Sequence, residues 1–206
     1  KLEQKFQPHK IPPSKHNKRK LGKTRFCLRV KKNLGEEFIN FIEDNANDLL
    51  LFLPNINNIS FIIENEKFIF QKKNEGDFVI LRSNQKNKTS SEKFLLFKHK
   101  IKTGKENNVI KFAFKVDGNN NKFIKDEQTN NLFTYFKLKT DTGLFFYFHA
   151  PFELDIGRTR PEDSEDNEYT KKECFNALTK CFEHFKKKKF LNSSFLEILP
   201  NSDDET

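Results

Sequence analysis

The chain contains no tryptophan, no methionine, only seven glycines and only three cysteines in 206 residues. Cys174 and Cys181 are too far apart for a disulfide along one helix, and we expect them to be small core residues. No C-x-x-C pair and no histidine pair at ligand spacing occurs, so the sequence predicts no metal site. No apolar run reaches about 18 residues and no secretory signal is present, which predicts an intracellular, cytoplasmic protein without a membrane contact.

The missing methionine and the amino-acid bias each have a simple interpretation. A natural chain starts with methionine, so a sequence that starts at Lys1 is interpreted either as a fragment or as a chain from which the methionine was removed. Phenylalanine supplies 25 residues, and together with the abundant lysine and asparagine it is typical of an AT-rich genome. The length allows one sizeable core or two small ones.

The net charge of +9 is concentrated at the N-terminus. Residues 1–32 contain twelve Lys/Arg and one acid, whereas residues 33–206 contain 26 basic and 28 acidic residues. The sequence therefore predicts a basic arm (1–23), one α+β domain (24–200) and an acidic tail (201–206). The arm is either a solvated linker or a nucleic-acid contact. A nucleic-acid contact would use Lys15, Lys18, Arg19, Lys20 and Lys23.

Alternating apolar residues predict a series of strands separated by polar turns. Two further polar stretches, 84–92 and 117–131, are expected to be loops. The strands are expected at Thr24–Val30, Ile56–Ile63, Lys67–Gln71, Phe78–Arg82, Lys93–Lys100 and Val109–Val116.

Helical stripes precede most of these strands. Gly35–Leu53 has the spacing of a helix pair or of one broken helix, which Pro54 ends. Asn45–Asp48 inside it is expected to be a polar break between the two helical parts.

The region Leu132–Leu199 is the one around which the chain is organised. Leu132–Phe136 and Leu144–His149 flank Asp141-Thr142-Gly143 and predict a β-hairpin. The second of these segments is entirely apolar from Leu144 to Phe148, so we expect it to be covered on both faces. His149 at its end is expected to be a packing residue and not a base.

A long amphipathic helix should follow this region. Ser164 and its neighbours are good N-cap residues, and Lys186–Lys189 suit the C-terminal end of the helix dipole. A short strand, Phe195–Leu199, is expected after the helix. The whole pattern indicates an α+β fold with a largely antiparallel sheet, a helix pair near the N-terminus and a long helix near the C-terminus. The apolar stripe of the long helix comprises Phe175, Leu178, Cys181, Phe182 and Phe185.

The order of several short motifs resembles the second half of GHKL (Bergerat-fold) ATPases of the sacsin-like group. Gly22-Lys-Thr24 and Leu49–Ile56 are similar to that group's closing Bergerat strand and first transducer helix. Two features differ from the family pattern: Lys137 stands where a proline is usual, and the additional residues Thr159-Arg160-Pro161 lengthen the arginine loop. The motifs that carry the resemblance are Leu132–Phe136, Lys139–Leu144, His149–Leu154, Arg158, Asp163–Asn167 and Phe195–Pro200.

This resemblance implies a transducer-like domain without the ATP-binding half. Asn45-Ala46-Asn47-Asp48 is similar to the nucleotide-binding Asn-Ala-x-Asp, but position 41 is Phe instead of Glu and no Asp-x-Gly-x-Gly occurs. The chain would then not hydrolyse ATP alone, and ATP with Mg²⁺ would bind to an N-terminal nucleotide-binding domain. Arg158 matches the family arginine that contacts the γ-phosphate, and Arg160 is its substitute. The group includes chaperone-like and defence-associated members.

Three other interpretations remain open at this point. Arg158 could instead pair with Glu162, Asp163 or Glu165 nearby. The chain could be a nucleic-acid-binding or ribosome-associated protein that uses its basic arm on a Phe-rich sheet. It could also be an interaction module similar in outline to a pleckstrin-homology domain, which would show a closed barrel.

Overall fold

The computed structural model of the chain describes residues 39, 40, 42, 45, 48–63, 66–85, 88–103, 106–126 and 131–199. All of these belong to the unit that spans residues 35–206. The predicted basic arm with its cationic residues, the strand Thr24–Val30 and the acidic tail lie outside the described residues. Those predictions therefore stay predictions, as do the domain boundaries at 23 and 200.

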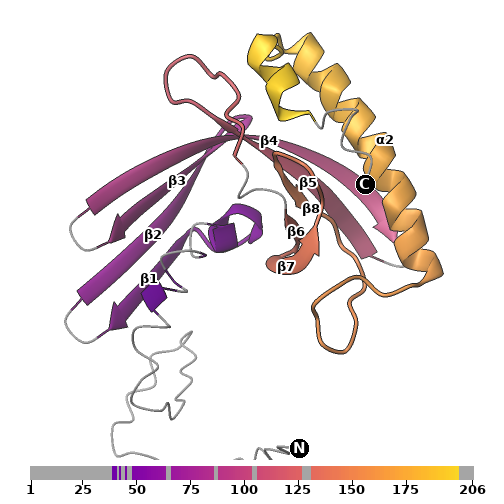
Figure 1. Cartoon of the computed structure of the whole chain (residues 1–206), viewed down its shortest axis with the longest axis horizontal. Coiled ribbons are helices and arrows are strands. Elements are labelled where there is room, and N and C mark those ends of the chain that lie inside the picture. The colour runs from indigo at the N-terminus through magenta and orange to yellow at the C-terminus, as the bar shows by residue number, and fades with distance from the viewer. Residues whose placement is uncertain are drawn as a thin grey trace, which may run out of the picture. The chain divides into compact units, whose positions relative to one another are not determined.

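One mixed sheet forms the centre of the described structure (Figure 1). Its order is β1-β2-β3-β4-β5-β8-β6-β7, and every neighbouring pair is antiparallel except β8 and β6. The predicted α+β class with a largely antiparallel sheet is confirmed. The strands are β1 (Asn58–Ile63), β2 (Glu66–Glu75), β3 (Phe78–Gln85), β4 (Lys88–Thr103), β5 (Glu106–Val116), β6 (Asn131–Thr134), β7 (Phe136–Asp141) and β8 (Tyr147–His149).

The first five strands follow one another as a meander, as the alternating pattern predicts. The expected loop 84–92 is wrong, because β3 extends to Gln85 and β4 begins at Lys88. The hydroxyls of Ser83 and Ser90 lie 2.7 Å apart across this strand pair. Hydroxyl residues of this kind extend a ladder that apolar periodicity alone does not mark.

The predicted hairpin between Leu132–Phe136 and Leu144–His149 is also wrong. β6 turns at Tyr135, which has a φ of 63°, and pairs with β7. β8 lies between β5 and β6 and is parallel to β6. An all-apolar segment needs cover on both faces, which an interior strand receives and an edge strand does not. Only Tyr147–His149 of the predicted strand Leu144–His149 forms β8. Within it Tyr147 belongs to one core and Phe148 packs against the other, so this part is covered on both faces, although the partner strand was not the expected one.

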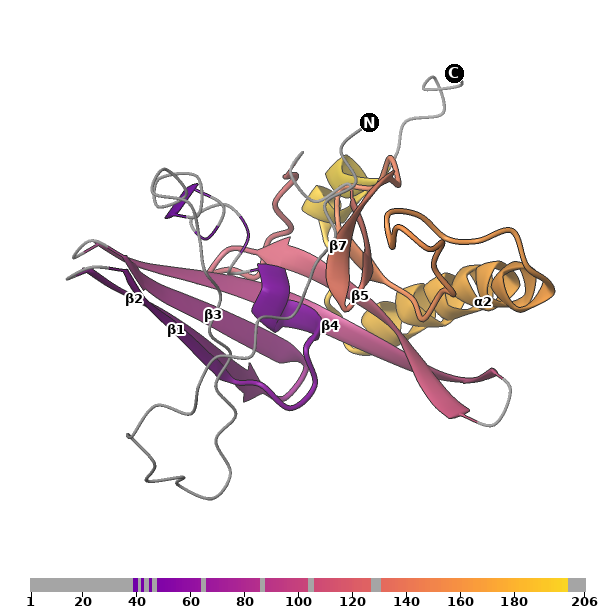
Figure 2. The same cartoon turned by 90° about the horizontal axis from the view of Figure 1, so that it is seen from below.

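Helices cover the two faces of the sheet (Figure 2). On one face, α2 (Glu165–Lys187) contacts β4 and β5. On the other face lies a helical segment at residues 48–52, and residues 39, 40, 42 and 45 are helical as well. Where a helix pair would divide lies outside the described residues. No helix in the described part of the chain combines the length and the apolar character needed to cross a membrane.

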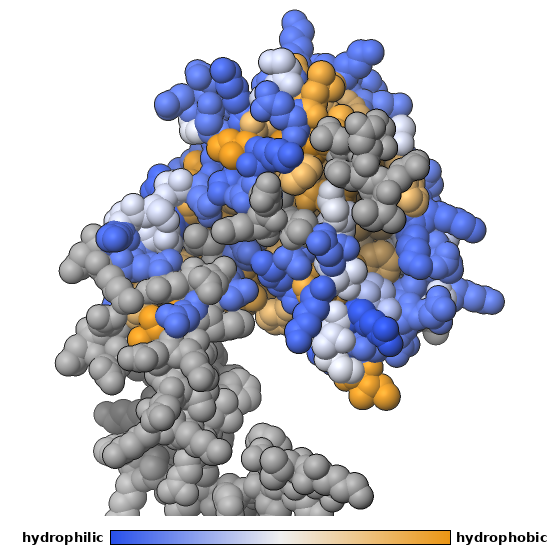
Figure 3. Space-filling view, viewed as in Figure 1, coloured by the Kyte–Doolittle hydropathy of each residue, from blue (hydrophilic) through white to orange (hydrophobic). Residues whose placement is uncertain are grey.

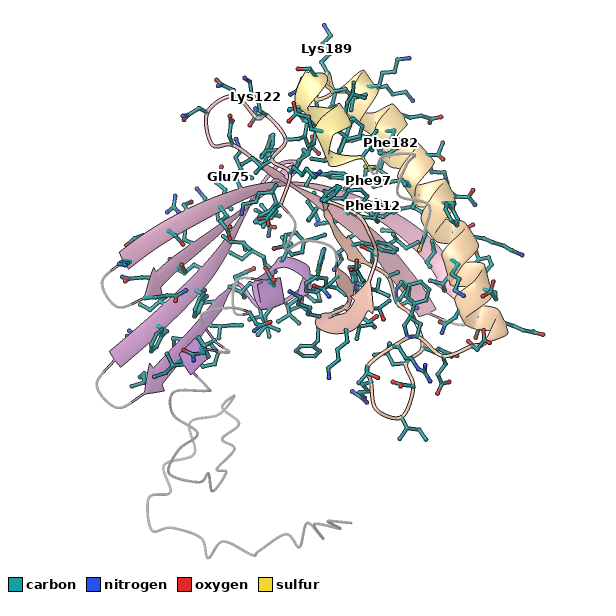
Figure 4. The ribbon with its side chains drawn as sticks, in the orientation of Figure 1. Glu75, Phe97, Phe112, Lys122, Phe182 and Lys189 are labelled. Atoms are coloured by element: carbon teal, nitrogen blue, oxygen red, sulfur yellow. The ribbon has the colours of Figure 1, made fainter. Side chains whose placement is uncertain are left out.

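Alternate residues of the central strands supply two separate cores. On β4, Leu95 belongs to the core beneath α2, and Phe94 belongs to the core beneath segment 48–52. Figure 4 shows Phe97, Phe112 and Phe182 gathered between the sheet and α2. Each fully buried Phe contributes about 1.5–3 kcal/mol to folding, so the abundant phenylalanine is used mainly as core.

Two details at the C-terminal end differ from expectation. Phe175 is 75% exposed, so it is not part of the apolar stripe, whereas Cys181 is buried as predicted and Ala177 is a buried residue that the prediction omitted. Residues 193–198 form the 3-10 helix η2 (Ser193–Ile198) and not a strand.

Among the described strands β1 and β7 are the two edges of the sheet, so the sheet is open. The pleckstrin-homology hypothesis requires a closed barrel instead.

Candidate functional site

The segment between β8 and α2 contains both predicted site residues, Arg158 and Arg160. Asn167 in the first turn of α2 is 1% exposed and fastens this segment to the helix. Its amide oxygen accepts from the Glu153 N–H at 2.9 Å, and its amide nitrogen donates to the carbonyls of Glu153 at 2.9 Å and Glu162 at 2.7 Å. The loop therefore leaves and returns at two fixed points.

Asp155 shapes the loop between those points. Its carboxylate accepts from the Thr159 N–H at 2.8 Å and from the Thr159 hydroxyl at 3.1 Å. Both hydrogen bonds lower the pKa of the Asp155 carboxyl, and the one from the Thr159 N–H has the larger effect. The Arg158 N–H donates to the Asp155 carbonyl at 2.8 Å, and Leu154 and Pro161 bridge the base of the loop. The loop is thus a defined turn.

Arg158 lies at the tip of this turn, exposed and with a φ of 52°. Its neighbour Arg160 lies with Nε 3.7 Å from the Asp155 carboxylate. Among the described residues Arg158 forms no ion pair with Glu162, Asp163 or Glu165, so the structure gives the alternative of local pairing no support. A left-handed φ costs a non-glycine residue about 1–3 kcal/mol, and the turn holds Arg158 in it.

The surface around the tip combines charge with one apolar group. Ile156 is 104% exposed, although it is a large aliphatic residue. Figure 3 shows a hydrophobic protrusion at the edge of the molecule where Figure 1 draws this loop. An isoleucine and an arginine at a fixed tip can contact another molecule without rearrangement of the loop.

A hollow of about 430 Å³ lies beside the loop but does not suit an anion. Its lining includes three acids and two cations, and Arg158 is not among them. Any phosphate that Arg158 contacts would therefore come from outside this surface. The charged lining residues are Asp155, Arg160, Glu162, Asp163 and Lys171.

A polar cluster connects segment 48–52 to the sheet. The Tyr147 hydroxyl on β8 donates to the Asp48 carboxylate at 3.0 Å, and Lys137 Nζ lies 4.0 Å from it. Burial raises the pKa of Asp48 to about 6, although the hydrogen bond from Tyr147 acts to lower that pKa. Asp48, the last residue of the expected polar break at Asn45–Asp48, is helical and its carboxylate has a buried partner, whereas positions 46 and 47 of that break lie outside the described residues.

A second cationic site lies on the face of the sheet that segment 48–52 covers. Lys72, Lys98 and Lys111 line a hollow of about 270 Å³ with Tyr135, Leu53 and Pro54; we call it the lysine pocket. Lys111 Nζ donates to the Phe52 carbonyl at 2.9 Å, and Lys72 Nζ donates to the Leu53 carbonyl. Carbonyls at the C-terminal end of a helix attract cations. Burial, followed by repulsion from Lys98, lowers the pKa of Lys72.

His149 and the cysteines do not form a catalytic pair. The His149 ring is 1% exposed and stacks on Phe52 with centroids 5.3 Å apart. Its Nδ1 lies 3.0 Å from the Phe133 carbonyl, and burial lowers the pKa of His149 to about 3. The predicted packing role is confirmed. Burial also raises the pKa of Cys174 to about 12 and that of Cys181 still further, so both thiols are protonated near neutral pH.

Sequence reasoning missed the lysine pocket, although a signal was present. Each lysine lies on the face of its strand that segment 48–52 covers, two residues after an apolar residue of the same face: Lys72 after Phe70, Lys98 after Leu96 and Lys111 after Val109. A charged residue in an apolar register is unusual and indicates either a satisfied partner or a ligand.

Comparisons with protein-family models, with curated proteins and with solved structures found no match. The resemblance to GHKL ATPases therefore stays a prediction from the motifs.

Proposed function

We propose that this chain is the transducer-side portion of a GHKL-type ATPase-like protein. In this role it presents Arg158 to the terminal phosphate of ATP held by a neighbouring nucleotide-binding domain. One observation supports this most: Arg158 is exposed at the tip of a defined turn and forms no ion pair in the described structure. Arg160, the predicted substitute, is engaged with Asp155.

The chemistry required of Arg158 is electrostatic. Charge spreads over the phosphoryl oxygens in the transition state of phosphoryl transfer, and a cation placed there in advance lowers the barrier. A fixed loop suits this task, because little entropy is lost when the guanidinium meets the phosphate. The exposed Ile156 beside it supplies an apolar contact for the neighbouring domain.

The proposal assigns nucleotide affinity to the neighbouring domain and not to this chain. Isothermal calorimetry of the 206-residue chain with Mg-ATP should give no affinity tighter than the millimolar range. The complete reading frame that encodes the chain should bind Mg-ATP much more tightly. A micromolar affinity of the 206-residue chain alone, or no ATP affinity in the complete protein, would contradict the proposal.

A further inference from the structure

The lysine pocket contains more positive charge than its structural contacts explain. Lys72 and Lys111 donate to the Leu53 and Phe52 carbonyls, so these two cations stabilise the end of segment 48–52. Lys98 has no hydrogen-bond partner among the described residues, and its side chain is exposed. Structural capping therefore accounts for two of the three lysines.

The position of Lys98 is unfavourable for folding alone. Lys98 and Lys111 are direct partners across the β4–β5 ladder. Like charges directly opposite each other destabilise a sheet. No acidic residue lines the pocket within the described structure, so nothing there neutralises the pair. Burial, with repulsion from Lys98 and then Lys72, lowers the pKa of Lys111 to about 8.

The size of the pocket limits the ligand. Sites for drug-sized molecules have volumes of roughly 300–1,000 Å³, and this hollow has about 270 Å³. Leu53 and Pro54 contribute apolar surface to its lining. A single compact group fits such a space, whereas a polymer strand requires a continuous groove.

We propose that the lysine pocket binds one phosphoryl group, either as free phosphate or as the end of a small phosphate ester. Lysine ammonium groups bind phosphate as point charges, and each charge-assisted hydrogen bond is stronger than a neutral one. A dianion between Lys98 and Lys111 would remove their repulsion. Within the described structure no carbonyl accepts a hydrogen bond from Lys98, so Lys98 is the residue that distinguishes ligand binding from capping.

The test measures the lysines themselves. Proton–carbon correlation spectra of the lysine Cε groups are recorded while inorganic phosphate replaces chloride at constant ionic strength. Lys72, Lys98 and Lys111 should shift together and saturate in the millimolar range. The Lys98→Gln variant loses one charge-assisted hydrogen bond to phosphate. Its dissociation constant for phosphate should therefore rise about tenfold or more.

A matched control separates local binding from net charge. Lys122→Gln removes the same charge from an exposed loop position, which Figure 4 shows projecting from the sheet, and it should leave the phosphate affinity unchanged. Both lysines are exposed, so both variants should fold. Equal weakening by the two variants, or lysine shifts that do not saturate, would overturn the proposal.

Two further titrations identify the source of the phosphoryl group. If AMP binds at the same three lysines, the ligand is a phosphate ester. If inorganic phosphate binds there and AMP does not, the ligand is the free ion. Both results support the proposal. A single-stranded oligothymidylate that shifts these lysines when phosphate and AMP do not would overturn it and favour a nucleic-acid interface.

Discussion

Asn167 shows how one buried side chain determines the position of a functional loop. The sequence marks it only as one of several residues suited to a helix N-terminus. In the structure the cap is Ser164, whose hydroxyl accepts from the Asn167 N–H at 3.2 Å, and the Asn167 amide instead binds the loop backbone. Residue type and spacing predicted the helix start, but the direction of a side chain depends on the tertiary partner.

Replacement of this amide tests its role. Asn167→Ala would leave the Glu153 N–H and two carbonyls without their partners. We expect the free energy of unfolding, measured by urea denaturation, to fall by about 2–4 kcal/mol. Asn176→Ala on the exposed side of α2, where the amide donates to Glu173, should cost less than about 0.5 kcal/mol. Equal losses in the two variants would show that Asn167 does not fasten the loop.

Apolar periodicity in the sequence predicted some elements of the fold better than others. The five strands β1–β5 and the helix α2 have repeated apolar spacing and good caps, so the sequence predicted them. The place of β8 depends on which strand ends meet in space. The local turn chemistry at Asp141-Thr142-Gly143 is present, since Asp141 accepts from the Gly143 N–H at 2.8 Å, yet it does not join two paired strands. Turn chemistry therefore did not reveal the partner of β8.

The contact between segment 48–52 and β8 is expected to depend on pH. The pKa of Asp48 is about 6 in the folded chain, compared with an ordinary value of 3.8. Between these values the folded state retains a proton that the unfolded state has lost, so stability decreases as pH rises from about 4 to 6. Asp48→Asn preserves an acceptor for the Tyr147 hydroxyl but does not titrate.

Urea denaturation across this range provides the measurement. The free energy of unfolding of the parent chain, relative to that of Asp48→Asn, should fall by roughly 2–3 kcal/mol between pH 4 and 6. A difference that stays constant with pH, or that rises, would show that the Asp48 carboxylate is not buried against β8.

At the scale of the whole molecule, one sheet supports two cores and two cationic sites. The composition indicated a chain able to bury a large Phe-rich interior, and the structure divides this interior between the two faces. Arg158 could be predicted as a candidate from the sequence because it belongs to a local motif. Lys72, Lys98 and Lys111 could not, because β2, β4 and β5 bring them together only in the folded sheet. Local signals therefore pointed to one candidate site, and strand register was needed for the other.

The central claim is that Arg158 acts on a nucleotide bound by a neighbouring domain. The most direct measurement is the ATP turnover of the complete reading frame with Arg158→Gln, compared with Arg82→Gln, which changes an exposed arginine on β3. Loss of the cation should lower turnover by about 100-fold or more, while ATP affinity changes little and Arg82→Gln stays at the parent rate. Turnover of the Arg158→Gln protein equal to that of the parent would contradict the claim.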